Sequence, residues 1–245
     1  MTSRSPEDAA PALEVAGLSK AFGARKALEG VGFELEQGAF LSVFGHNGAG
    51  KTTLLRVLAT LARPSAGTVR VLGYDLKEQP DEVRERIGLL AHRSLLYPDL
   101  TAEENLLFAA RLYGVADPAQ RVSQMLATVE LSARRHDAVR SFSRGMAQRL
   151  SIARALVHDP QLVLLDEPYS GLDPHAAQIL DGLLADMRTG RSIVMVSHDL
   201  RKGFDLCTHV LLLSKGRTAV FARSSGLAFD DFSARYHGLV GREAP

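Results

Sequence analysis

One short loop constrains this chain more than any other stretch. Residues 45–52 match the pattern G-x-x-x-x-G-K-T, which is typical of loops that bind phosphate. The apolar run at residues 40–44 predicts a strand before the loop, and the helical spacing of residues 53–58 predicts a helix after it. This context favours a phosphate site over a chance match in a glycine-containing turn.

The residue types in this loop predict what each position does. Glycine leaves room for backbone N–H groups to close on phosphate oxygens, and the following helix points its positive dipole end at the same place. Lys51 is expected to reach the β- and γ-phosphates of a nucleotide, and the Thr52 hydroxyl is expected to hold Mg²⁺. The predicted binding residues are Gly45, His46, Asn47, Gly48, Ala49, Gly50, Lys51, Thr52 and Thr53.

Composition narrows the class of protein. The 245 residues fit one large α/β domain or one domain with an inserted subdomain, and a net charge of +1 gives no global attraction to nucleic acid or to a membrane surface. The single cysteine, Cys207, cannot form an internal disulfide, so we expect a reducing compartment and an ordinary semi-buried role. No apolar run approaches the ~20 residues of a membrane span, and residues 1–8 lack the apolar core of a signal peptide. We therefore expect a soluble protein that reaches a membrane only through a partner.

Hydrophobic patterning predicts an α/β chain with a helical insertion. Strands are predicted at residues 13–22, 27–36, 68–72, 87–92, 162–166, 193–198, 210–213 and 218–221, and helices at residues 81–86, 101–113, 119–131, 143–158 and 174–188. Thr101 and Glu104 have the spacing of a capping box. The predicted division is a disordered lead-in at 1–11, a core at 12–79 and 157–223, a helical subdomain at 80–156, and a weakly helical tail at 224–245.

Two acids end the apolar run at residues 162–165. Asp166 is expected to bind Mg²⁺ directly or through water, and Glu167 is expected to polarise the water that attacks the γ-phosphate. The alternative is an acidic pair that caps a helix. The acids stand at the carboxyl end of a strand that is predicted to be buried on both faces, and ligands bind at the carboxyl ends of strands in open α/β sheets. Capping is therefore the weaker interpretation.

Two further positions have a functional and a structural interpretation, and two more are marked by their place at the start of a helix. His198 ends a neighbouring strand and could donate a hydrogen bond to the γ-phosphate, although a purely structural histidine is the better interpretation of that residue in isolation. Phe22 precedes the loop and could stack on an adenine ring or lie in the core at a strand end. Ser143 stands where a helix N-cap belongs, and Gly145 permits close backbone approach.

Taken together, these motifs resemble the nucleotide-binding subunit of ABC transporters, and they occur in the family's order over residues 13–222. The resemblance implies a P-loop NTPase of ABC type, with a RecA-like parallel-sheet core, an antiparallel β subdomain and an inserted helical subdomain. It assigns residues 45–52 to the Walker A loop, residues 162–167 to Walker B and residues 143–146 to the signature motif. Residues 170–173 resemble the D-loop, Phe22 the adenine-stacking aromatic and His198 the switch histidine.

The chain departs from the family pattern at two places. The signature usually has the sequence L-S-G-G-Q, whereas residues 142–146 are Phe-Ser-Arg-Gly-Met, which keeps Ser143 and Gly145. His92 stands where the Q-loop glutamine is usual. Because Mg²⁺ prefers oxygen ligands, we expect His92 to act through a water or on the γ-phosphate, or else only to pack at a hinge. Residues 89–101 together with the altered signature most resemble the ATPase subunit of the haem exporter of cytochrome c maturation.

The resemblance also implies activity and partners. It implies an ATP hydrolase that uses Mg²⁺ and forms a head-to-tail homodimer, or a heterodimer with a related cassette. A separate membrane subunit is expected to dock near residues Tyr97–Thr101, which places the chain at the cytoplasmic face of the cell membrane, without a nucleic-acid partner.

Three other functions compete with haem export. The chain could serve another exporter, of drugs or lipids. A soluble ABC protein of translation or DNA repair is disfavoured because such proteins usually carry two cassettes or a long coiled coil, and this chain has one cassette and no heptad array. The third alternative is a structural module that binds ATP without hydrolysing it. Such a module would need neither Glu167 nor His198, so the presence of both residues disfavours it.

Overall fold

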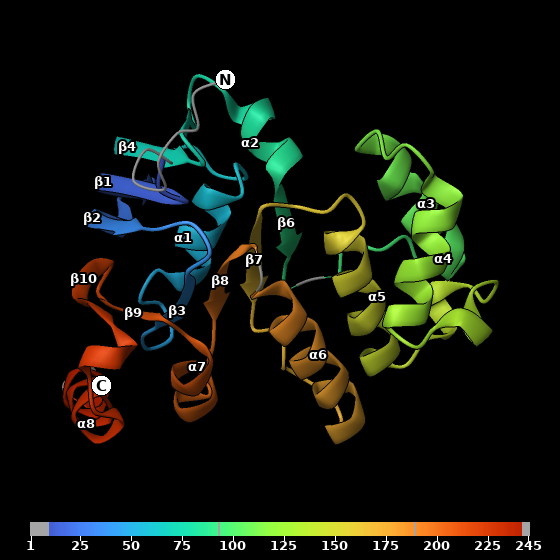
Figure 1. Cartoon of the computed structure of the whole chain (residues 1–245). Helices are drawn as coiled ribbons and strands as arrows, with labels where there is room; N and C mark the ends of the chain where they lie inside the picture. Colours follow the sequence, from blue (N-terminus) through green and yellow to red (C-terminus); the bar gives the residue numbers. More distant parts are fainter. Residues whose placement is uncertain (1–9, 93, 189, 242–245) are drawn as a thin grey trace, which may run out of the picture.

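A computed structural model describes residues 10–92, 94–188 and 190–241. Figure 1 shows helices α3 (Ala102–Leu112), α4 (Pro118–Thr128) and α5 (Arg144–Leu156) grouped on one side of the molecule, away from the strands near the N-terminus. Most of the predicted lead-in at residues 1–11 lies outside the described residues. None of the helices formed by the described residues combines the length and apolar composition needed to cross a membrane.

The larger sheet has six strands in the order β10-β9-β3-β8-β7-β6. Neighbouring strands run parallel, except that β10 pairs antiparallel with β9. Every residue of β3, β7 and β8 is buried, as expected for central strands covered on both faces. The strands are β3 (Phe40–Phe44), β6 (Ile87–Leu90), β7 (Leu162–Asp166), β8 (Ser192–Val196), β9 (His209–Ser214) and β10 (Arg217–Arg223).

The smaller sheet is antiparallel, with the order β2-β1-β4-β5. Its long strands alternate buried and exposed residues over much of their length, so one face packs inward. Helix α1 (Lys51–Leu58) shares its buried leucines with a core built from both sheets. The strands are β1 (Leu13–Phe22), β2 (Arg25–Leu35), β4 (Ala66–Val71) and β5 (Tyr74–Asp75). The two sheets and the helical group form the predicted ABC-type P-loop fold.

Side-chain caps define where most helices begin. The predicted capping box is present, since Thr101 accepts from the Glu104 backbone and the Glu104 side chain accepts from Thr101 N–H. Ser143 caps α5 by accepting from the Met146 N–H at 3.2 Å. The remaining helices are α2 (Pro80–Arg86), α6 (Pro174–Met187), α7 (Leu200–Leu206) and α8 (Phe229–Gly241).

Strand β6 and helix α7 differ from the sequence-based expectations. Strand β6 pairs in parallel with β7, so it belongs to the larger sheet although the predicted boundary at residue 80 grouped it with the helices. It ends at Leu90, opposite Leu165, and does not extend to residue 92. Helix α7 was not predicted, and its signal was Asp199, whose carboxylate caps the Lys202 N–H.

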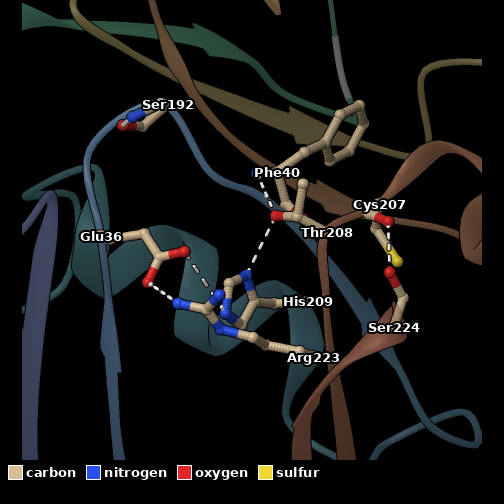
Figure 2. A network of polar contacts seen from close by, with 9 residues as sticks. Glu36, Phe40, Ser192, Cys207, Thr208, His209, Arg223 and Ser224 are labelled. Carbon is tan, nitrogen blue, oxygen red and sulfur yellow. Dashed lines mark hydrogen bonds and ion pairs between the residues drawn. The ribbon is translucent and has the colours of Figure 1, made fainter. Parts of the chain in front are cut away.

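A polar network closes the end of the larger sheet opposite the glycine-rich loop (Figure 2). The Thr208 hydroxyl accepts from the Phe40 N–H at 2.9 Å and contacts His209 Nδ1 at 3.0 Å. Arg223 pairs with Glu36 at 2.8 Å, which ties β10 to the turn after β2. Cys207 is free and is buried more fully than the semi-buried position expected for it, and Ser224 Oγ donates to its carbonyl.

Candidate active site

The glycine-rich loop has a backbone that only glycine adopts easily. Gly45, Gly48 and Gly50 have φ values of 149°, 87° and 106°. A Cβ at Gly45 would lie 2.4 Å from the Leu213 carbonyl oxygen, and a Cβ at Gly50 would lie 2.6 Å from that of Ala27. The loop is therefore shaped by contact with β9 and β2 as well as by its own sequence.

Lys51 lies at the start of α1 with its ammonium group folded over the loop. Its Nζ donates to the carbonyl oxygens of Gly45 at 2.7 Å and His46 at 3.0 Å. Burial lowers the pKa of Lys51, while the carboxylates of Glu167 and Asp166 raise it. The loop thus holds a positive charge at the position from which a lysine reaches phosphate oxygens.

A cavity of about 370 Å³ opens beside this loop. Its wall joins the loop to the ends of two neighbouring strands, because Glu167 follows β7 and His198 follows β8. Arg25 and Ala27 of β2 also contribute, although no local pattern in the sequence pointed to them. The lining residues are Phe22, Arg25, Ala27, Asn47, Gly48, Gly50, Lys51, Thr52, Thr53, Glu167 and His198.

Glu167 and His198 form a close pair on the cavity wall. The Glu167 N–H bonds to the Val196 carbonyl at 3.1 Å, which extends the β7–β8 ladder by one residue and brings the two side chains together. His198 Nε2 lies 2.5 Å from Glu167 Oε1. Glu167 has a φ of 53°, a conformation unusual for a residue other than glycine and often found at functional sites.

Asp166 and Thr52 fit the expected Mg²⁺ ligands. Asp166 is buried, and its Oδ1 has no hydrogen-bond partner among the described residues. The pKa of Asp166 is raised, chiefly by burial and then by the neighbouring charge of Glu167. The charges of His92 and Lys51, and a hydrogen bond from Thr52, act in the opposite direction. No group of three or more His, Cys, Asp or Glu suited to a metal occurs in the part of the chain that the structure describes. A Mg²⁺ ion here would be held by Thr52 and Asp166 together with phosphate oxygens of the nucleotide, as is usual for this ion.

His92 lies outside the main cavity. It lines a second pocket together with Arg144, Ser170 and both acids, of which Glu167 also lines the main cavity. The structure therefore brings His92 close to Asp166 and Glu167, and it places Arg144, the altered signature residue, in the same pocket.

The signature residues lie away from the cavity of their own chain. Ser143 is exposed at the start of α5, and Gly145 is buried. A Cβ at Gly145 would meet only ordinary contacts with Asp173 and Ala176, so nothing described within this chain requires glycine there. The Arg144 guanidinium covers Gly171 of the next loop.

Phe22 and residues 97–99 are exposed, while Leu100 and Thr101 are half-buried. Phe22 is 49% exposed at the cavity, with Lys20 Nζ 4.9 Å from its ring centroid. The buried Asn105 side chain holds the segment by accepting from Tyr97 N–H at 2.8 Å and donating to the carbonyls of Tyr97 and Thr101. Sequence reasoning missed Asn105, because an asparagine within a helix carries no specific signal.

A polar cluster behind the site was also missed. The Tyr169 hydroxyl donates to Asp181 at 2.5 Å, and Lys202 pairs with Asp181 at 3.0 Å while lying 3.7 Å from the Tyr169 ring centroid. Burial and the Asp181 carboxylate raise the pKa of Tyr169 far above its ordinary value, so its hydroxyl stays protonated. The cluster ties the loop after Glu167 to α6 and to α7, which follows His198.

Fold and cavity together define a P-loop ATPase cassette. A model of the ABC transporter family matches residues 28–170, and the chain belongs to that family, whose members hydrolyse ATP. The chain is an ATP-binding subunit of an ABC transporter.

Curated relatives and solved structures agree with this assignment. The ABC transporter ATP-binding protein NatA of Bacillus subtilis is 37% identical over 195 residues, which cover 78% of this chain and 79% of that protein. The daunorubicin resistance ATP-binding protein DrrA3 of Streptomyces coeruleorubidus is 35% identical, covering 84% and 66%. The ATP-binding subunit of an ABC transporter has a TM-score of 0.84 at 29% identity, covering 91% and 98%. A dimeric post-hydrolysis cassette, MJ0796, bound to ADP and Pi, has a TM-score of 0.81 at 25% identity, covering 88% and 100%.

Proposed function

We propose that this chain powers the export of a small lipophilic molecule through a separate membrane subunit, as one half of a head-to-tail dimer. The observation that carries the proposal is the shared cavity wall, in which the loop with Lys51 faces the Glu167–His198 pair. Binding alone would not need a carboxylate and an imidazole at hydrogen-bond distance beside the phosphate loop. The wall therefore supports a cycle of ATP binding and hydrolysis.

The residues divide the hydrolytic work. Lys51 and the loop N–H groups hold the phosphates, and Phe22 stacks on the adenine ring. Glu167 orients the attacking water and accepts its proton, while His198 fixes the carboxylate and contacts the γ-phosphate. Thr52 and Asp166 would hold Mg²⁺, which supplies charge neutralisation at the phosphates. His92 acts from the second pocket through a water and not as a direct metal ligand.

The position of the signature supports the dimer. Ser143 and Gly145 do not line the cavity of their own chain, and the exposed Ser143 can serve the cavity of a second chain. The similar MJ0796 cassette has a dimeric solved structure. In such an arrangement both chains hold the γ-phosphate, and its loss on hydrolysis loosens the interface. A two-fold axis makes the two sites equivalent in a homodimer.

The names of relatives favour export over other functions. They include a Nod factor export protein of Cupriavidus metallidurans, 34% identical over 84% of this chain and 69% of that protein, and daunorubicin and linearmycin resistance proteins. These names give no support to haem export, the function that residues 89–101 suggest. We place the chain at the inner membrane surface, held there by a membrane subunit that contacts the segment Tyr97–Thr101.

The hydrolytic proposal is tested with Glu167→Gln. The amide cannot accept a proton, so turnover should fall about 100-fold or more while ATP is still bound. Size-exclusion chromatography should then show an ATP-dependent dimer, and Glu167→Gln combined with Ser143→Arg should remain monomeric. Wild-type turnover by Glu167→Gln, or a monomer at high concentration with Mg-ATP, would contradict the roles given to Glu167 and the interface.

The transport proposal is tested by purifying the tagged chain from membranes of its own organism. A stoichiometric membrane subunit should co-purify, and its deletion should make the cells sensitive to a lipophilic drug. Loss of c-type cytochromes in place of drug sensitivity would instead assign haem export. Recovery of the chain without any membrane protein, from cells in which it is fully functional, would contradict the proposal.

A further inference from the structure

Large apolar side chains are exposed on one face of the molecule. Apart from Phe22 at the cavity, all the exposed large hydrophobic residues that the structure describes belong to this face, which we call the docking face: Leu61, Leu95, Tyr97, Phe108, Leu112 and Tyr113. Neighbouring hollows share Leu112 and Tyr113, and the Tyr97 ring packs edge-on against Phe108 at 5.4 Å, so the face is continuous. A contiguous apolar surface of this kind is typical of an interface.

A pocket of about 180 Å³ opens on the docking face between α1, β6 and α5. Leu61, Leu95 and Tyr113 form its apolar wall, and Arg154 and His158 of the α5 region line it from within. Among the described lining residues none is acidic. A cation therefore lies in an apolar hollow without an opposing carboxylate.

Arg154 differs from the other partly buried arginines of the helical group. Arg121 donates to the carbonyls of Leu156 and Val157, and Arg149 donates to that of Val129. Arg154 lines the pocket and has no hydrogen bond or ion pair with any of the described residues. Burial lowers the pKa of Arg154, because desolvation disfavours the charged form, yet a guanidinium remains charged in proteins.

His158 does not supply the missing partner, because its Nδ1, the remaining acceptor of the ring, has no hydrogen bond to any of the described residues. Its Nε2 lies 2.9 Å from the Ile87 carbonyl oxygen, so Nε2 carries a proton and donates there. Its ring stacks on Tyr113 with centroids 3.8 Å apart, which fixes the wall of the pocket. Arg84, at the rim, is already paired with Asp81 and with the Thr60 hydroxyl. The pocket thus presents one unpaired cation and one paired cation.

We propose that Arg154 receives a carboxylate from an amphipathic helix of the membrane subunit seated on the docking face. The inference rests on the proposed function, and it specifies the partner's chemistry: apolar side chains for the leucines and tyrosines, and one Asp or Glu directed into the pocket. Charge complementarity selects this occupant, because a partly buried guanidinium loses its remaining water when the face is covered and is then costly unless paired.

The experiment uses the full chain and its membrane subunit, identified by co-purification and solubilised in mild detergent. Labelled wild type, Arg154→Met, Arg154→Lys and Arg84→Met are titrated with the membrane subunit. Arg154→Met should weaken binding about thirtyfold or more, since it leaves a carboxylate buried and unpaired, and Arg154→Lys should weaken it less. Arg84→Met is the matched control and should change binding less than about twofold, because its charge is paired within this chain.

A charge exchange then tests the pair itself. Arg154→Glu should abolish binding, and replacing one cytoplasmic carboxylate of the membrane subunit with arginine should restore it. ATP hydrolysis by the isolated variants should match wild type, which excludes misfolding. Equal binding by Arg154→Met and wild type, or no carboxylate whose exchange rescues Arg154→Glu, would overturn the inference. Failure of the wild-type chain to bind any membrane subunit would instead contradict the proposed function.

Discussion

The nucleotide cavity and the docking face show two ways of building a site. In the cavity, the charged groups already face partners within the chain: Lys51 bonds to loop carbonyls, and Glu167 pairs with His198. On the docking face, large apolar side chains are exposed, and the Arg154 guanidinium has no hydrogen bond or ion pair with any of the described residues. The cavity is preorganised for a small ligand, whereas the docking face is complete only with a second molecule.

This difference predicts opposite responses to mutation. Changes in the cavity should alter activity of the isolated chain, because its geometry is fixed by backbone contacts. Changes on the docking face should leave the isolated chain intact and act only on assembly. The following experiments test that division, from the largest expected effect to the smallest.

The largest effect is expected for Gly50→Ala. A Cβ there would lie 2.6 Å from the Ala27 carbonyl oxygen and 2.8 Å from Leu28 Cδ2, at a φ of 106°. The loop must therefore shift, and a displacement of about 1 Å can cost about 100-fold in turnover. Steady-state ATP hydrolysis measures this loss.

Gly182→Ala is the matched control for Gly50→Ala. Gly182 lies within α6, where a Cβ would meet nothing within 4 Å. Alanine should stabilise the helix by up to about 1 kcal/mol and leave turnover unchanged. Equal turnover by the two alanine variants would show that the strain at Gly50 does not shape the cavity.

The nucleotide cavity was more predictable from sequence than the docking face, for a physical reason. The functional residues of the loop at 45–52 are adjacent in sequence, and so are the two acids at the end of β7, so a short motif identifies each of them. Arg25 lines the cavity with residues distant in sequence, and Asn105 bonds to the nearby segment that precedes its helix, but the pattern at both positions is ordinary. Arg154 looks like a common helix residue until the structure shows that it lies in an apolar pocket.

The fold, like the two sites, was predictable only where its signal lies in residues adjacent in sequence. Strands with continuous apolar runs, such as β3 and β7, were predicted, because burial on both faces leaves a local mark. The position of β6 in the larger sheet depends on pairing with β7, which lies more than seventy residues later, as the register Ile87–Leu162 shows. No local pattern contains that information.

Tyr169→Phe should have the next largest effect. It removes the donor to Asp181, and loss of a hydrogen bond to a charged group should destabilise the chain by about 1–2 kcal/mol. Because the cluster supports the loop after Glu167, turnover should also fall several-fold at saturating ATP. Urea unfolding and kcat are measured together, with Tyr236→Phe as the control within α8, for which little change in either quantity is expected.

Asp166→Asn should separate stability from activity. Burial raises the pKa of Asp166 above 3.8, so the folded chain binds its proton more tightly than the unfolded chain. In the wild type, the contribution of this carboxyl group to the free energy of unfolding is therefore present below pH 3.8. It is lost as the pH rises through the higher pKa that the group has in the folded chain. At neutral pH the asparagine variant should be more stable by about 1 kcal/mol, with the difference vanishing below pH 3.8.

Mg-ATP should reverse that order. The wild type should gain thermal stability from the ligand, while Asp166→Asn, which lacks the carboxylate expected to hold Mg²⁺, should gain less and hydrolyse ATP poorly. Thermal unfolding with and without Mg-ATP measures both effects. An asparagine variant that is less stable than wild type at neutral pH without ligand would contradict the cost assigned to the buried charge.

The smallest effect is expected for Leu112→Ser. Leu112 is 71% exposed on the docking face, so its replacement should change the free energy of unfolding by no more than about 0.5 kcal/mol. ATP hydrolysis and the ATP-dependent dimer of Glu167→Gln should also persist, because the docking face shares no lining residue with the nucleotide cavity. Binding to the membrane subunit should weaken, since a covered leucine contributes apolar area. If Leu112→Ser instead prevents the ATP-dependent dimer, the docking face belongs to the contact between cassettes, and the two sites are not separate.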